Sequence, residues 1–108
     1  MCYGTGVPLR HEGDELRLDE LLWDEWNEEH VRAHGIEPHE VEEAVFDPAA
    51  LALRTRAGRQ PRYVILGRSQ GGRYLLVVLQ PTGGKRSYVV TARDMTDGER
   101  RRFRRRGK

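Results

Sequence analysis

The apolar run Tyr74-Leu75-Leu76-Val77-Val78-Leu79, inside residues 73–80, decides the fold of this 108-residue chain. Every residue of the run is aliphatic or aromatic, so a strand formed by it would bury both of its faces. A strand of that kind lies in the middle of a sheet. We therefore expect residues 73–80 to form the central strand.

Further strands are predicted on both sides of this run. They are expected at Leu51–Arg56, Arg62–Gly67 and Lys85–Arg93. The intervening segments have turn chemistry that is typical of antiparallel hairpins, namely Ala57-Gly58, Gly71-Gly72 and Pro81-Thr82-Gly83-Gly84. The leucines of Leu16–Leu22 indicate a short strand nearer the N-terminus.

Two helices are predicted before this group of strands and one after it. Asp24 can cap a helix that runs to about His34 and stops at Gly35. A second helix is expected to start at Glu37, with Pro38 in its first turn, and to end at Phe46-Asp47-Pro48. Thr96-Asp97-Gly98-Glu99 is a capping box that opens the last helix.

The first predicted helix has an unusually polar inward stripe. At helical spacing, one face would carry Trp26, Asn27, His30, Val31 and His34. We expect Trp23 and Trp26 to anchor the core rather than to stack on bases.

Length and composition favour one soluble domain. Residues 1–15 show no regular period, so we predict a flexible N-terminal segment followed by a single domain at 16–108. The only cysteine is Cys2, which excludes an internal disulfide and fits a reducing compartment. No apolar run is long enough to span a membrane and no signal peptide is recognisable, so a cytoplasmic location is expected.

Charge is divided sharply between the two halves of the chain. Residues 1–50 hold 14 Asp/Glu and 3 Lys/Arg, whereas residues 51–108 hold 3 Asp/Glu and 16 Lys/Arg. The overall charge of +2 hides this polarity. The pattern indicates a polyanionic partner, or an acidic and a basic segment that meet each other, and both can hold.

The strand Lys85–Arg93 offers a candidate anion-binding face. Strict alternation would pack Tyr88, Val90 and Ala92 on the core. It would leave cations and hydroxyls on the other side, at Lys85, Ser87, Thr91 and Arg93. Arginines of the neighbouring strand and hairpin could extend that surface, namely Arg62, Arg68 and Arg73. Such a face could hold a phosphodiester, and a solvated face with scattered arginines is the alternative.

His30 and His34 leave three interpretations open. Histidines at i and i+4 can share a metal ion, but Val31 stands where the metalloprotease pattern has Glu, and no third ligand is recognisable. We therefore predict no metal site and no cofactor. A hydrogen-bonded core histidine and a histidine that contacts or deprotonates RNA both remain.

The C-terminal segment Arg100–Lys108 is strongly basic and includes Arg100 and Arg104. It is compatible with nucleic-acid binding and equally with a solvated face or docking of an acidic partner.

Motifs in both halves of the chain occur in a characteristic order. The first half carries Trp23–Val31, His34-Gly35-Ile36 and Pro38–Glu43 followed by Phe46-Asp47-Pro48. The second half carries Tyr63–Arg68, Leu75–Val78 and Val90–Thr96 followed by Glu99-Arg100-Arg101. Together these segments resemble the family of BrnT-type toxins. The likeness covers roughly residues 18–106 in the same order. Ala33 stands before His34 where many members have Lys, so the chain looks closer to a sub-branch with the pattern Trp-Asp-x-x-Asn-x-x-His.

The resemblance implies an α+β fold like that of RelE-type ribonucleases. Together with the strand and helix pattern, it leads us to expect an antiparallel sheet of about four to five strands, flanked by two N-terminal helices and a C-terminal helix. It also implies the toxin of a type II toxin–antitoxin system, a ribonuclease neutralised by a cognate antitoxin encoded nearby. A dimer and a toxin–antitoxin hetero-oligomer both stay open.

The leading hypothesis is a metal-independent endoribonuclease acting on single-stranded RNA. Arg93, with Arg68 or Arg62, is the expected phosphate clamp, and His34 or His30 the proton-transfer group. We expect His34 to be the functional histidine and His30 the structural one. The remaining RNA contacts are expected from Arg73, Lys85, Ser87, Thr91, Arg100 and Arg104. A non-catalytic nucleic-acid- or protein-binding module with the same fold is the alternative.

Overall fold

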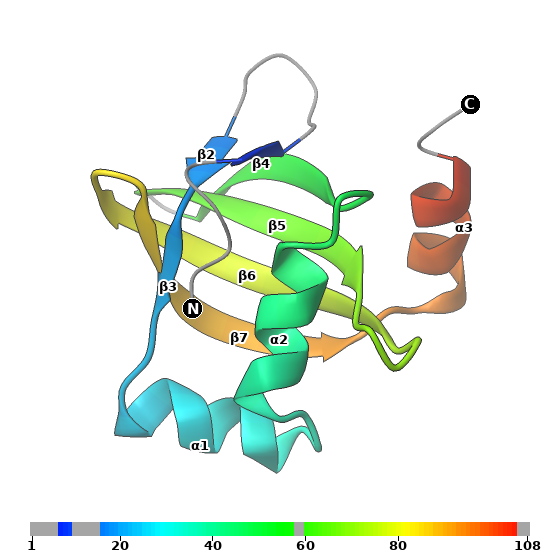
Figure 1. The fold of residues 1–108 in the computed structure, drawn as a ribbon, viewed down its shortest axis with the longest axis horizontal. Helices are drawn as coiled ribbons and strands as arrows, with labels where there is room; N and C mark the ends of the chain where they lie inside the picture. Colours follow the sequence, from blue (N-terminus) through cyan, green and yellow to red (C-terminus); the bar gives the residue numbers. More distant parts are fainter. Residues whose placement is uncertain (1–6, 10–15, 58–59, 106–108) are drawn as a thin grey trace.

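The computed structural model describes residues 7–9, 16–57 and 60–105 (Figure 1). In chain order, its elements are β1 (Val7–Leu9), β2 (Leu16–Leu18), β3 (Glu20–Leu22), α1 (Glu25–Ala33), α2 (Pro38–Val45), β4 (Leu51–Ala57), β5 (Gln60–Arg68), β6 (Tyr74–Gly83), β7 (Arg86–Asp94) and α3 (Asp97–Arg105).

The main sheet has five strands in the order β3-β7-β6-β5-β4. The apolar run lies in β6 at the centre, and β4, β5, β6 and β7 pair antiparallel in succession, so the predicted α+β class, central strand and hairpins are confirmed. The turn between β6 and β7 is shorter than predicted, because Pro81, Thr82 and Gly83 belong to β6. The sheet is mixed rather than wholly antiparallel, because β3 pairs parallel with β7. A hairpin can be predicted from the sequence of its turn. The pairing of β3 with β7 has no such local signal, because most of the chain lies between the two strands.

The helix ends follow their capping residues. The Asp24 side chain accepts a hydrogen bond from the Asn27 backbone N–H, and the Asn27 side chain accepts one from the Asp24 N–H. Gly35 has a φ of +77°, in the left-handed region that ends helices. Glu40 accepts a bond from the Glu37 N–H at the start of α2. The three predicted helices are therefore confirmed.

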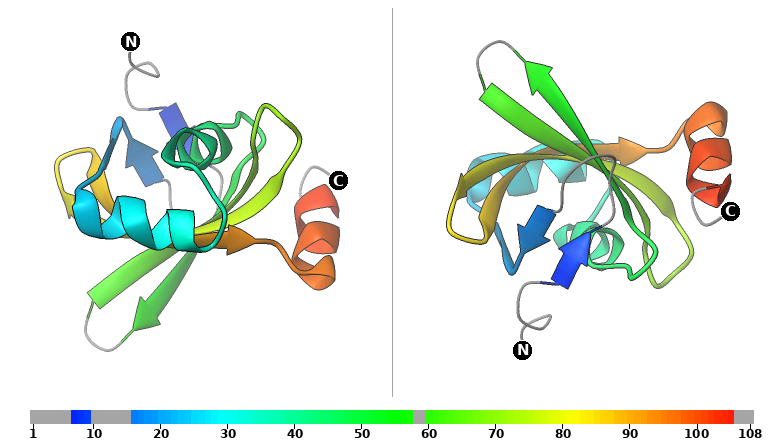
Figure 2. Two further views of the ribbon diagram at one scale, coloured as in Figure 1. Left: turned by 90° about the horizontal axis from the view of Figure 1, so that it is seen from below. Right: turned by 90° about the horizontal axis from the view of Figure 1, so that it is seen from above.

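Two clusters of buried side chains occupy the two faces of the sheet. The α2 side chains Val41, Ala44 and Val45 belong to the same cluster as Ile65, Leu75, Val77 and Val89. On the opposite face, Phe103 of α3 packs in a cluster with Leu66, Leu76 and Met95. Helices α2 and α3 thus cover opposite faces, and both views of Figure 2 place α3 beside the end of β7, apart from α1 and α2.

Helix α1 lies along β7 at the edge of the sheet that short β3 leaves uncovered. Asn27 is buried, and its side-chain amide donates to the Leu22 carbonyl at 2.9 Å and to the Val89 carbonyl at 3.0 Å. The helix therefore satisfies part of an open strand edge. The inward stripe is narrower than predicted, because Asn27 and Val31 are buried whereas His30 and His34 are exposed.

The prediction for Trp26 is wrong. Its exposed fraction is 82%, because it points away from the sheet at the start of α1. Trp23 does pack against the core, and its indole N–H donates to Glu42 at 2.8 Å.

Strict alternation along β7 is also wrong. A register shift opposite Val78 and Leu79 leaves Val90 as an extra residue, since Val78 pairs with Thr91 and Leu79 with Val89. This β-bulge puts both Val89 and Ala92 into the core facing α2. Ser87, expected on the anion-binding face, is only 2% exposed.

At the N-terminus, Val7–Leu9 pair with Leu16–Leu18, so a strand lies inside the segment predicted to be flexible. The rest of that segment and Gly58 of the Ala57-Gly58 turn lie outside the described residues. Among the residues that are described, no helix is long and apolar enough to cross a membrane.

Candidate functional site on the open face of the sheet

The face of the sheet that carries α3 is only partly covered. Cross-strand pairing aligns two rows of side chains on it, because paired residues share a face. One row is Leu51, Leu66, Leu76 and Arg93, and the next is Leu53, Val64, Val78 and Thr91. Helix α3 covers part of the first row. Beside it lies a cleft of about 430 Å³ lined by Leu53, Arg54, Thr55, Val64, Leu66, Leu76, Glu99 and Arg102.

Arg93 lies at the border between the open face and α3. Its two terminal nitrogens bind the two carboxylate oxygens of Glu99 at 2.9 and 2.8 Å, a bidentate pair. This hydrogen-bonded pairing lowers the pKa of Glu99 and raises that of Arg93. The Arg93 guanidinium therefore already donates two parallel hydrogen bonds to an anion. A phosphoryl group could accept the same pair of hydrogen bonds as the Glu99 carboxylate does.

Glu99 is fixed by the start of α3. Its carboxylate accepts the Thr96 backbone N–H at 2.9 Å, while the Thr96 hydroxyl accepts the Glu99 N–H at 3.2 Å. The capping box predicted from the sequence is therefore confirmed. The second role of Glu99, as the partner of Arg93, was not predicted, because a capping box gives no information about contacts with a preceding strand.

His30 reaches the open face from α1. Its Nε2 lies 2.8 Å from the Thr91 hydroxyl, and the ring of His34 packs against the His30 ring at a centroid distance of 5.1 Å. Both rings are exposed. Thr91 and Arg93 lie two residues apart on one face of β7, so an imidazole and a guanidinium border the same surface.

Arg62 lies at the other end of this face. Alternation along β5 puts Arg62 on the side of Val64 and Leu66, and its Nε donates to the Gln80 side-chain oxygen at 3.2 Å. The prediction that Arg62 extends the surface agrees with this placement, although β6 separates it from β7. Arg54, Arg102 and Gln80 were not singled out in the sequence, because nothing local distinguishes them from solvated residues.

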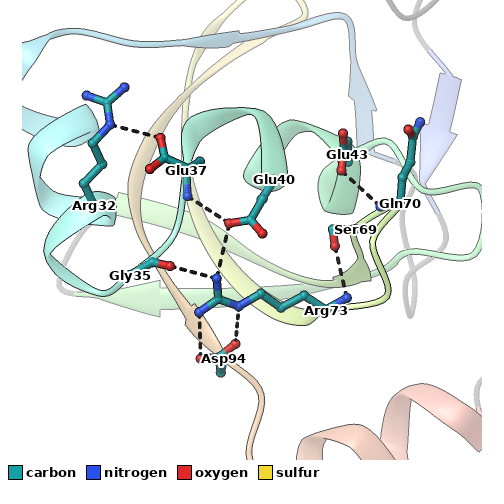
Figure 3. Close-up of polar contacts among 9 residues, drawn as sticks. All are labelled: Arg32, Gly35, Glu37, Glu40, Glu43, Ser69, Gln70, Arg73 and Asp94. Carbon is teal, nitrogen blue, oxygen red and sulfur yellow. Dashed lines mark hydrogen bonds and ion pairs between the residues drawn. The ribbon is translucent and has the colours of Figure 1, made fainter.

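Arg73 does not belong to this surface. Figure 3 shows its guanidinium between two carboxylates and a carbonyl: Asp94 binds it at 2.8 and 3.1 Å, Glu40 at 3.2 Å and the Gly35 oxygen at 2.8 Å. Hydrogen bonding to Asp94 raises the Arg73 pKa, and Arg73 lowers the pKa of Asp94. Arg73, expected from the sequence to contact RNA, forms a clamp here that joins the start of β6 to β7, α2 and the α1–α2 connection.

Two other expected contacts are not gathered at the site. Ser87 is buried, so its hydroxyl is not presented to a ligand. Lys85 lies in the turn before β7, at the opposite end of that strand from Arg93, which corresponds to about 25 Å along an extended chain.

Arg68, Arg100 and Arg104 meet on the far side of α3 from the cleft. Their guanidinium carbons lie 5.3, 5.9 and 5.7 Å from the centre of the Tyr74 ring. The sequence predicts Arg68 in the phosphate clamp with Arg93, and Arg100 and Arg104 as RNA contacts. The structure places Arg68 over Tyr74 instead of beside Arg93, and nothing in the sequence indicates that Tyr74 brings the three arginines together.

Within the described residues, no group of three or more His, Cys, Asp or Glu side chains could hold a metal ion. His30 and His34 are close to each other, and the hydrogen-bond partner found for His30 is a threonine rather than a carboxylate.

The family model described as "Ribonuclease toxin, BrnT, of type II toxin-antitoxin system" matches residues 23–99. The chain belongs to the BrnT family of ribonuclease toxins. The match runs from Trp23, ahead of α1, to Glu99 in α3, so it includes the open face, His30 and Arg93. Membership confirms the predicted family and the toxin role in a type II toxin–antitoxin pair, with RNA as substrate and an antitoxin as partner. No curated protein matches the chain.

Proposed function

We propose that this BrnT-family protein is a metal-independent endoribonuclease that cleaves single-stranded RNA on the open face of the sheet. The observation that carries the proposal is the Arg93 fork, which holds a carboxylate in bidentate geometry at the rim of a cleft. A phosphoryl group in place of that carboxylate would accept the same two hydrogen bonds.

The cleavage chemistry needs a nucleophile, two proton transfers and stabilisation of negative charge. The ribose 2′-hydroxyl attacks the phosphorus, the bond to the 5′-oxygen breaks, and a 2′,3′-cyclic phosphate forms. One group removes the proton of the 2′-hydroxyl and another supplies a proton to the leaving 5′-oxygen. Arg93 would hold the negative charge that builds on the non-bridging oxygens.

His30 is the better candidate for proton transfer on this face. Its Nε2 contacts Thr91, whose side chain shares a face with Arg93, whereas His34 reaches that surface only through the His30 ring. This reverses the roles expected from the sequence. Histidine suits proton transfer because its ordinary pKa lies close to neutral pH.

RNA cleavage in EDTA tests the mechanism. We expect a single-stranded RNA to be cut in EDTA to a cyclic phosphate product, and the same strand with deoxyribose at the cut site to stay intact. Arg93→Ala and His30→Ala should each reduce the rate by about 100-fold or more. Arg86→Ala, on the same strand but at its other end, is the matched control and should cleave normally. Cleavage of the deoxy strand, or complete loss in EDTA, would contradict the mechanism.

One observation favours the alternative of a binding module without chemistry. Glu99 occupies the Arg93 fork in this structure, so RNA must displace it or bind beside it. A protein that binds a non-cleavable 2′-O-methyl RNA but never cleaves its ribose counterpart, and that does not arrest growth when expressed alone, would support the module. Growth arrest abolished by Arg93→Ala would support the nuclease.

We further propose a cytoplasmic location and a cognate antitoxin encoded by the neighbouring reading frame, a small protein with an acidic segment and a DNA-binding motif. Co-expression of that protein should relieve growth arrest, and purification of the pair would establish whether a dimer or a hetero-oligomer forms.

A further inference from the structure

Helix α3 carries charged side chains on two sides. Glu99 and Arg102 line the open-face cleft, whereas Arg100 and Arg104 lie over the ring of Tyr74. Residues 100 and 104 are four apart and therefore share one side of the helix. Phe103 is buried between the two sides, against the sheet. The helix thus forms a ridge with a cationic surface on each flank.

The second flank is built around one aromatic ring. We call Tyr74, Arg68, Arg100 and Arg104 the Tyr74 cluster. The ring packs against the buried cluster that contains Leu66 and Leu76, and it meets the Phe103 ring edge to face at a centroid distance of 5.8 Å. A guanidinium that lies against an aromatic ring keeps its N–H edges available for an anion.

The Tyr74 cluster has a surplus of positive charge. Arg100 pairs with Asp97 at 2.7 Å. Within residues 16–57 and 60–105, no carboxylate forms an ion pair with the side chain of Arg68 or Arg104.

Two carboxylates line a pocket together with Arg68, and both accept hydrogen bonds from backbone N–H groups. Asp47 accepts the N–H groups of Ala49 and Arg68, and Glu43 accepts the N–H of Gln70. Three arginines gathered around one paired carboxylate, Asp97, still repel one another, so a polyanion would stabilise this arrangement.

We propose that the Tyr74 cluster is a second phosphate subsite, which holds a backbone phosphate of the same RNA strand whose scissile phosphate lies at Arg93. The inference rests on the proposed function. RNA fits better than an acidic protein segment because the two flanks are separated by one helix, about 10 Å across, which a strand of a few nucleotides can span while presenting phosphates to both. Arginine side chains that bind phosphate groups, rather than base edges, make contacts that do not depend on the RNA sequence.

The test is binding of non-cleavable 2′-O-methyl oligonucleotides, a dinucleotide and an oligomer of about ten residues, by the full-length protein. The variant is Arg68→Gln with Arg104→Gln, and Arg32→Gln with Arg86→Gln is the charge-matched control. The Arg68/Arg104 variant should bind the longer oligomer about tenfold more weakly than the wild type. Its slope of log affinity against log salt concentration should be shallower by about 0.7. Its dinucleotide affinity should not change, and neither should any value for the control. Melting temperatures of the variants exclude misfolding.

Binding of non-cleavable RNA does not depend on catalysis, so the two proposals fail separately. A wild-type protein that cleaves RNA, with no length-dependent loss in the Arg68/Arg104 variant, overturns the subsite alone. A protein that never cleaves but shows the length-dependent loss keeps the subsite and overturns the nuclease. If the variant binds both oligonucleotides normally but loses affinity for a poly-glutamate peptide, the flank serves an acidic protein and the RNA subsite is overturned.

Discussion

At the residue scale, Asp94 and Arg73 form the ion pair that fastens the end of β7 to the start of β6. Hydrogen bonding to Arg73, followed by the charge of the same residue and of Arg100, lowers the pKa of Asp94 below the ordinary value of 3.8, while partial burial works in the opposite direction. Because the folded state holds the proton less tightly than the unfolded state, this pair stabilises the fold fully above the ordinary value. The contribution is lost as pH falls toward the lowered pKa.

We therefore predict that Asp94→Asn lowers the free energy of unfolding at pH 7 and makes its decline shallower between about pH 5 and pH 3 than in the wild type. Urea denaturation at several pH values measures both effects. Asp97→Asn is the control, because Asp97 is fully exposed beside Arg100, and a solvent-screened pair should change the curve much less. Parallel curves for wild type and Asp94→Asn would contradict the prediction.

Roles of single residues were predictable from the sequence only where the partner is local. The pairs Asp24 with Asn27 and Thr96 with Glu99 lie three residues apart, and both capping arrangements follow from that spacing. Arg73 meets Glu40 across 33 residues, so nothing near Arg73 in sequence distinguishes a structural clamp from an RNA contact. Tyr74 presents the same difficulty, since two of its arginines come from α3.

At the element scale, the packing of α2 on β5 depends on Gly67. A Cβ atom at this position would lie 1.9 Å from the Ala44 carbonyl oxygen, a distance that real contacts do not show. The helix backbone therefore touches the strand backbone directly. A glycine inside a strand is a signal for such an approach, although it does not identify the neighbouring element.

Gly67→Ala should consequently destabilise the protein by about 3 kcal/mol, because either α2 or β5 must move away from a well-packed core. Thermal melts measure the loss. Gly71→Ala provides the comparison: its added Cβ would meet nothing closer than the Ser69 hydroxyl at 3.9 Å, so its melting temperature should stay near that of the wild type. Equal melting temperatures for both variants would show that α2 can shift at little cost.

Elements with a local signature were predicted well, and those that depend on the rest of the fold were not. The helices and hairpin strands follow from caps, turns and apolar period. The bulge at Val90 and the parallel pairing of β3 with β7 do not, because both are set by what packs on β7 from elsewhere. The position of α1 depends in the same way on Asn27, whose amide bonds to two carbonyls have no sequence pattern. Leaving those carbonyls unpaired would cost about 1–3 kcal/mol.

At the scale of the whole molecule, the charge asymmetry seen in the sequence becomes an asymmetry in space. The acidic half supplies α1 and α2, and the basic half supplies α3 on the opposite face from α2. Arg73 joins the halves through Glu40, while Arg93 and Arg100 pair with acids of their own half. The sequence left open whether the halves meet or a polyanion binds. This arrangement favours a polyanion on the α3 side, with α2 on the opposite face and α1 at the sheet edge, where His30 reaches Thr91.

Such a polarised molecule should steer RNA before any contact forms, and the effect can be separated from the contacts themselves. Glu25 and Glu29 are exposed on α1, far in sequence from the basic face. Replacing both with glutamine removes long-range repulsion, so the association rate for a non-cleavable RNA should rise roughly twofold at low salt. The slope of log affinity against log salt concentration should stay nearly the same, at about −0.7 for each phosphate neutralised, because that slope reports phosphate contacts, which neither glutamate makes. Stopped-flow fluorescence with labelled 2′-O-methyl RNA gives the rate, and equilibrium titrations over a range of salt concentrations give the slope. A steeper slope in the variant would mean that Glu25 and Glu29 themselves lie against the RNA, and the open face would then have to extend beyond His30 along α1.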